Sequence, residues 1–79
     1  MNKKVYAAVM SGKSDFNIRF TEFCNLIIGL GFKFIRQKGS HVMFYHPIIK
    51  KSLNLQPDGD KAKVYQVRQL REIIRSYNL

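Results

Sequence analysis

Residues 31–47 read GFKFIRQKGSHVMFYHP, and this stretch decides how the chain folds. Two runs rich in aromatic and β-branched residues, 32–36 and 42–46, flank a polar segment with the sequence QKGS, which is typical of a β-hairpin. His41 follows this segment directly and stands at the start of the second run. The stretch therefore predicts two antiparallel strands with an imidazole beside the turn that joins them.

Helical periodicity is found on both sides of the hairpin. Apolar residues at helical spacing predict an amphipathic helix over residues 19–30, closed by glycines, and a second helix over residues 64–77. Between the hairpin and the second helix, residues 52–56 alternate apolar and polar side chains, as a half-buried strand does. The sequence PDGD at residues 57–60 predicts a turn.

The order α-β-β-β-α favours an α+β fold, in which a three-stranded antiparallel sheet carries two helices on one face. Alternation along the strands predicts six side chains on the helix face: Phe32, Phe34, Val42, Phe44, Leu53 and Leu55. His41, Met43 and Tyr45 are expected on the open face. His46 shares the helix face or lies beyond the strand end, so the two histidines are not expected to form one site.

The length of 79 residues predicts a single domain over residues 1–79, with an N-terminal extension at residues 1–15 that can hold one or two helical turns. Cys24 is the only cysteine, which excludes an internal disulfide and indicates core packing. No apolar run approaches the roughly 20 residues of a membrane span, and residues 1–13 lack the apolar core of a signal peptide. We therefore expect a cytoplasmic protein without a membrane partner.

The charge of the chain is strongly unbalanced, because 14 Lys and Arg residues face 5 Asp and Glu residues, for a formal net charge of +9. Such an excess favours binding to nucleic acid or to an acidic protein, since it acts on phosphate charge and releases counterions. The alternative is a solvated basic surface that contributes only to solubility.

The block RQKGSH at residues 36–41, together with the preceding Gly31-Phe32, resembles the HicA family of bacterial toxins. In the order of its elements the resemblance extends from about residue 20 to residue 79. It implies a fold like that of double-stranded-RNA-binding domains, an mRNA interferase activity and a HicB-type antitoxin as partner. By position, the catalytic histidine of the family falls on His41.

Two positions depart from the pattern of many members of this family. Val42 stands where many members have a second histidine, and the third strand reads LNLQPD at residues 53–58 where many have V-P-x-H. The histidine that the family requires is still present at position 41. The departures leave substrate preference open, together with the possibility of a variant that binds RNA without cutting it.

RNA can be cleaved without a metal because its own 2′-hydroxyl can attack the adjacent phosphate. That step needs a base, an acid and positive charge, and a histidine serves as acid or base near neutral pH. We predict His41 in this role, Lys38 as the cation on the phosphate, and the backbone at Gly39 and Ser40 as a phosphate cradle. Tyr45, Lys38 and water are candidates for the second proton-transfer group. The alternative is that His41 is an ordinary exposed histidine after a turn.

Other residues extend the predicted RNA or partner surface. Arg36 and Tyr45 join the phosphate-binding group, and Tyr45 suits either stacking on a base or contact with a partner protein. Arg68, Arg71 and Arg75 form an i, i+3, i+7 row on the last helix, which suits phosphate oxygens, an acidic antitoxin or plain solvation.

No cofactor or metal is expected. Asp58 and Asp60 flank a turn glycine without further ligands, so the paired acids of a magnesium nuclease are missing. His46 suits a structural or surface role better than a catalytic one. Two functions remain: an endoribonuclease toxin centred on His41, and a non-catalytic double-stranded-RNA-binding module that relies on its basic side chains. A basic domain that binds only protein is a third reading.

Overall fold

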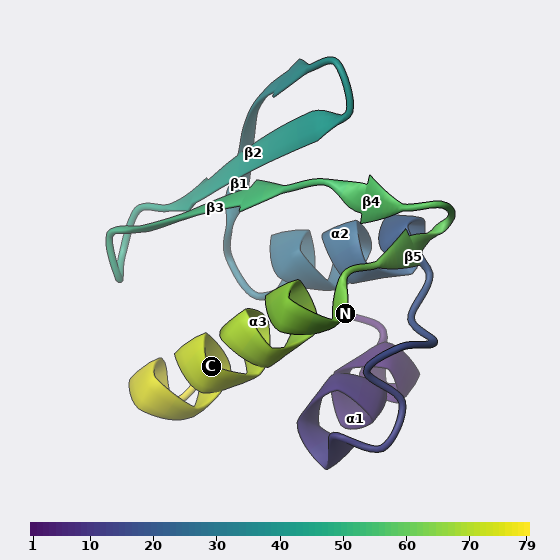
Figure 1. The fold of residues 1–79 in the computed structure, drawn as a ribbon. Helices are drawn as coiled ribbons and strands as arrows, with labels where there is room; N and C mark the ends of the chain where they lie inside the picture. The colour runs from purple at the N-terminus through teal and green to yellow at the C-terminus, as the bar shows by residue number, and fades with distance from the viewer.

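The computed structural model describes residues 1–79 and shows an α+β fold with a three-stranded antiparallel sheet of order β1-β2-β3 (Figure 1). In chain order the elements are α1 (Lys3–Ser11), α2 (Phe20–Gly29), β1 (Lys33–Lys38), β2 (His41–His46), β3 (Lys51–Leu55), β4 (Pro57–Asp58), β5 (Lys61–Ala62) and α3 (Val64–Tyr77). The predicted α-β-β-β-α arrangement is confirmed. Helix α1 precedes this arrangement, and the structure adds a small β4–β5 hairpin at the predicted turn.

The molecule is layered, with α2 and α3 on one side of the sheet and α1 beyond them, as Figure 1 shows. Buried apolar side chains recur at spacings of one helical turn along α2 and α3. They are Phe23, Leu26 and Ile27 in α2 and Val67, Leu70 and Ile74 in α3. None of the three helices is both long and apolar enough to cross a membrane.

The expected N-terminal helical turns are present as α1. Its first turn is capped by Asn2, whose Oδ1 accepts hydrogen bonds from the backbone N–H groups of Lys4 and Val5 at 3.0 and 3.2 Å. Val5 and Val9 are buried and belong to the same core cluster as the residues of the sheet and the other helices. Helix α1 is therefore packed into the fold rather than appended to it.

The predicted helix face of the sheet is confirmed for the central residues, since Phe32, Phe44, Leu53 and Leu55 are all buried. Phe34 also lies on this face, as expected, because it pairs with Phe44 across the hairpin, but it is 55% exposed rather than buried. Its ring contacts the ring of Phe44 with centroids 6.2 Å apart, so it lies on the helix side of the sheet. It stays exposed because β1 is an edge strand of the hairpin, whose turn extends away from the helices (Figure 1).

The β4–β5 hairpin connects the sheet side of the molecule to the start of α2. The backbone N–H of Ala62 donates to the carbonyl of Ile18, and the N–H of Phe20 donates to the carbonyl of Asp60, both at 2.8 Å. These bonds satisfy backbone groups at the start of a helix that has no side-chain cap. The turn predicted at residues 57–60 is thus also an anchor for α2.

Candidate active site

The hairpin turn places Lys38 and His41 directly opposite each other, with Gly39 and Ser40 between them. Gly39 has a φ of +59°, and a glycine with positive φ at the first central position is the pattern of a type II′ turn. A Cβ atom at Gly39 would meet no heavy atom within 4 Å. The backbone of this turn is therefore open to the approach of a ligand.

A β-bulge in β1 decides which side chains join His41. The register shifts between Phe34 and Arg36, so that Ile35 is an extra residue without a partner on β2. In a regular strand Phe34, Arg36 and Lys38 would share one face, since the side-chain period is two. The extra residue moves Arg36 and Lys38 to the opposite face, which is the face of His41.

These side chains surround an open hollow of about 600 Å³ on the sheet face away from the helices. The residues that line it are Arg36, Lys38, Gly39, His41, Met43 and Asn54. The ion pairs of the chain are both made by Asp15, so the charges of Arg36 and Lys38 are not neutralised by a carboxylate. The hollow thus combines an exposed imidazole with two free cations.

His41 has one protein partner in this hollow. Its ring Nδ1 lies 3.3 Å from the side-chain Oδ1 of Asn54, which comes from β3 and is paired in register with Met43. Sequence reasoning missed Asn54 as a site residue. The signal was present, because the alternation of Leu53 and Leu55 into the core sends Asn54 to the open face.

Two glutamine side chains hold the turn. Gln37 Nε2 donates to the carbonyl of Gly39, and Gln56 Nε2 donates to Ser40 Oγ, each at 3.1 Å. The Gln56 amide oxygen in turn lies 3.4 Å from Lys63 Nζ, at the start of α3. Since the Ser40 oxygen accepts this bond, its own hydroxyl hydrogen stays available for a ligand.

His46 has a different environment at the other end of β2. Only 5% of this residue is exposed; Nε2 lies 3.0 Å from the carbonyl of Leu30, and Nδ1 accepts from the N–H of Ile48 at 3.2 Å. Its ring also meets the Phe32 ring edge-on, with centroids 5.0 Å apart. These contacts fix the connection between α2 and β1, and they match the structural role that the sequence favoured for His46.

Gly31 is required by the position of this ring. Its φ is +104°, a conformation that residues with a Cβ rarely adopt, and an added Cβ would lie 2.6 Å from His46 Nε2. The Gly31-Phe32 pair therefore packs around a buried histidine at the end of β2 opposite His41.

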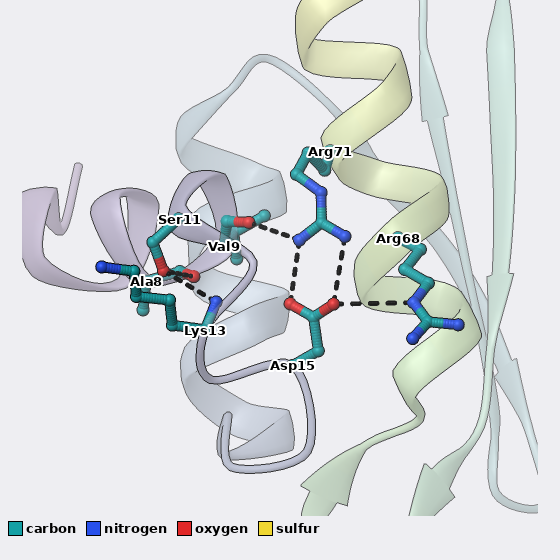
Figure 2. A network of polar contacts seen from close by, with 7 residues as sticks. All are labelled: Ala8, Val9, Ser11, Lys13, Asp15, Arg68 and Arg71. Carbon is teal, nitrogen blue, oxygen red and sulfur yellow. Dashed lines mark hydrogen bonds and ion pairs between the residues drawn. The ribbon is translucent and has the colours of Figure 1, made fainter.

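The arginine row on α3 is divided between two environments. Arg71 donates to both carboxylate oxygens of Asp15 at 2.8 and 3.0 Å and to the Val9 carbonyl at 2.9 Å, as Figure 2 shows. This hydrogen-bonded guanidinium, against the opposing effect of burial, lowers the pKa of the Asp15 carboxyl below its usual value. Arg71 is thus a structural link from α3 to α1. Arg68 lies 3.7 Å from the Asp15 carboxylate, but its side chain is 68% exposed. Arg75 is exposed as well.

Three further residues lie outside the hollow. Tyr45 is half-buried on the face of His41 but four residues further along β2, a separation of about 13 Å. Cys24 is half-buried against the core, as the sequence predicted, and burial raises the pKa of its thiol to about 11. Asp58 and Asp60 belong to no group of His, Cys, Asp or Glu side chains that could hold a metal ion.

A comparison with models of known protein families shows which family this chain belongs to. A family model described as the HicA toxin of bacterial toxin-antitoxin systems matches residues 20–76. The chain belongs to the HicA toxin family. Membership gives it the role of a toxin and an antitoxin as its partner, and the matched residues include α2, the whole sheet and most of α3. No curated protein and no solved structure matches this HicA chain, so its likeness to double-stranded-RNA-binding domains stays a prediction.

Proposed function

We propose that this HicA toxin is a metal-independent endoribonuclease that cleaves mRNA in the cytoplasm, with His41 as general acid or base. The observation that carries the proposal is the exposed imidazole of His41 in a hollow lined by Arg36 and Lys38. RNA brings a phosphate and a 2′-hydroxyl to such a site, and the site brings a proton-transfer group and positive charge.

The proposed reaction is an internal displacement at phosphorus. The 2′-oxygen forms a bond to phosphorus while its proton passes to a base, and the bond from phosphorus to the 5′-oxygen breaks as that oxygen receives a proton from an acid. The products are a 2′,3′-cyclic phosphate and a 5′-hydroxyl end. A positioned acid or base contributes about 10²–10⁴-fold to the rate of such a step.

The cations next to His41 suit the charge that develops on the phosphate. Arg36 offers a planar fork that can bond two phosphate oxygens, whereas Lys38 acts as a point charge directly opposite His41. The open backbone of Gly39 and the Ser40 hydroxyl add donors at the same turn. Of the candidates for the second proton-transfer group, Lys38 and water are within reach of the hollow, whereas Tyr45 lies outside it.

The proposal also covers the partners. We assign the inhibitory partner to the HicB type, and Arg68 and Arg75 are the exposed members of the α3 row that can meet its acidic surface or the RNA. Arg71 is left out of this surface because its guanidinium is engaged by Asp15.

The test is cleavage of a defined mRNA in excess EDTA by the wild type and by His41→Ala. The wild type should produce fragments ending in a 2′,3′-cyclic phosphate, and the variant should be slower by about 10²–10⁴-fold. Equal circular dichroism spectra and urea midpoints of the two proteins serve as the folding control. Full activity of His41→Ala, or cleavage that EDTA abolishes, would contradict the proposal. Intact RNA shifted in a gel by both proteins would indicate the non-catalytic RNA-binding module instead.

A further inference from the structure

The contact between His41 and Asn54 indicates which ring nitrogen of His41 carries a hydrogen. Asn54 presents its amide oxygen, which only accepts hydrogen bonds, to the ring Nδ1 of His41 at 3.3 Å. A hydrogen bond at this contact therefore requires the ring nitrogen Nδ1 to carry the hydrogen and donate it. In the neutral imidazole the hydrogen on Nδ1 leaves the lone pair on Nε2.

The other ring nitrogen has no partner in the protein. His41 is exposed, and its hydrogen bond to the rest of the chain is the one through Nδ1. Nε2 is thus the ring atom left for a ligand in the hollow, with Arg36 and Lys38 as the charged groups that line it.

We propose that Asn54 is a positioning residue that holds His41 in the Nδ1–H tautomer, so that Nε2 is the atom that exchanges a proton with the RNA. The tautomer follows from the contact alone, whereas its role in cleavage rests on the proposed function. Because the Asn54 amide is uncharged, it orients the ring without adding a carboxylate to the basic hollow. It also excludes rotations of the ring that would turn Nδ1 toward the substrate.

The second histidine supplies an internal reference of the opposite kind. His46 accepts backbone hydrogen bonds at Nδ1 and meets the Leu30 carbonyl with Nε2, so its hydrogen lies on Nε2. In their neutral forms the two histidines of this chain are therefore expected to adopt opposite tautomers. This difference can be read directly from ring nitrogen chemical shifts.

The test is a long-range ¹H–¹⁵N NMR spectrum of the ¹⁵N-labelled full chain at about pH 8.5, where imidazoles are neutral. The wild type should show one Nδ1–H ring and one Nε2–H ring, and the His41→Ala spectrum should lack the Nδ1–H ring. Asn54→Ala should shift the tautomer ratio of His41 toward Nε2–H by about 2- to 10-fold, the range of a single net hydrogen bond. The His46 signals should not change.

The matched control is Ser52→Ala, because Ser52 is exposed on the same strand and face but pairs with Tyr45 rather than lining the hollow. Its His41 signals and its cleavage rate should equal those of the wild type. An Nε2–H form of His41 in the wild type, or an unchanged His41 in Asn54→Ala, would overturn the proposal.

Kinetics separate a positioning role from a merely structural one. Asn54→Ala should reduce cleavage by about 2- to 10-fold, in line with the loss of the favoured tautomer. Asn54→Asp keeps the acceptor, so it should retain the Nδ1–H tautomer, and its acid limb should move to higher pH because a carboxylate favours the charged imidazole. An Asn54→Asp profile that overlays the wild type would overturn the role. If the NMR result is as expected but the wild type cuts no RNA, the proposed function fails and the tautomer assignment stands.

Discussion

The two ends of β2 carry one histidine each, and these histidines differ in everything that governs the behaviour of an imidazole. His41 lies on the open face, exposed, with one ring nitrogen bonded to a side chain and the other free. His46 lies on the helix face, buried, with both ring nitrogens engaged by backbone groups. The comparison teaches that the surroundings, not the residue type, decide whether an imidazole has a ring nitrogen left for a ligand.

The largest expected effect comes from exchanging both histidines for alanine, one at a time. His46→Ala removes a packed ring and leaves the Leu30 carbonyl without its partner, so the free energy of unfolding should fall by about 3–5 kcal/mol. His41→Ala should change it by less than about 0.5 kcal/mol, because the side chain is exposed. Urea unfolding monitored by circular dichroism measures both values.

Similar losses in the two variants would break the comparison. Gly31→Ala tests the same packing from the glycine that contacts the His46 ring. The added Cβ would collide with the ring, and the backbone φ of residue 31 is unsuited to alanine. That variant should lose stability as well, by about 2–4 kcal/mol.

A smaller effect is expected from the cations at the His41 end. Arg36→Ala and Lys38→Ala should each weaken RNA binding. Each should also reduce the slope of log Kd against log salt concentration by about 1, the value for one lost phosphate contact. Each substitution is combined with His41→Ala to prevent cleavage. Binding of these proteins to a fluorescent RNA over a series of salt concentrations then gives the slope.

Lys13→Ala is the matched control for the cation variants, because Lys13 is an exposed cation on the α1–α2 connection, outside the hollow. The comparison between the two ends of β2 would be weakened if the Lys13 variant reduced the slope as much as the Arg36 or Lys38 variants.

The smallest expected effect is on the change of stability toward acid pH, and it comes from the ion pair between Asp15 and Arg71 among the helices. The pKa of Asp15 is lowered in the folded chain, chiefly by its hydrogen bonds to Arg71, so its contribution is complete above the unfolded value of about 3.9 and is lost as the pH falls through the folded value. Asp15→Asn should therefore cost about 1–3 kcal/mol at pH 7, and the difference from the wild type should shrink below about pH 4. Urea midpoints between about pH 7 and pH 2 measure this dependence.

The control for the acid prediction is Asp58→Asn, which changes an exposed aspartate without an ion pair. A difference between Asp15→Asn and wild type that stays constant down to pH 2 would show that the carboxylate charge is not what Arg71 stabilises. RNA cleavage near neutral pH should be the same in all three proteins, because Asp15 lies away from the hollow.

The elements with strong local signals were predictable. Helices α2 and α3 follow from apolar spacing, and the hairpin follows from the chemistry of Gly39 and Ser40 between two β-rich runs. His41 at the turn follows from the same reading, and the match of residues 20–76 to the HicA toxin family confirms the resemblance seen in the RQKGSH block.

The remaining features depend on contacts between distant residues. The bulge at Ile35 is a one-residue register shift that no pattern in β1 announces, yet it decides the face of Arg36 and Lys38. The Asn54 contact joins residues 13 apart in the chain and needs the β2–β3 register. Arg71 bonds to Asp15, 56 residues away, and is therefore not available to a partner, which the i, i+3, i+7 spacing could not predict.

The position of β1 at the edge of the sheet has a consequence for how copies of the protein behave in concentrated solution. The backbone of this strand has no neighbouring strand on one side, and its apolar side chains Phe34 and Ile35 are exposed. Bare, partly apolar edges invite strands of other chains to add to them, and charged side chains prevent this. Arg36 and Lys38 belong to this edge strand, so we expect the cations that line the hollow also to oppose fibrous self-association.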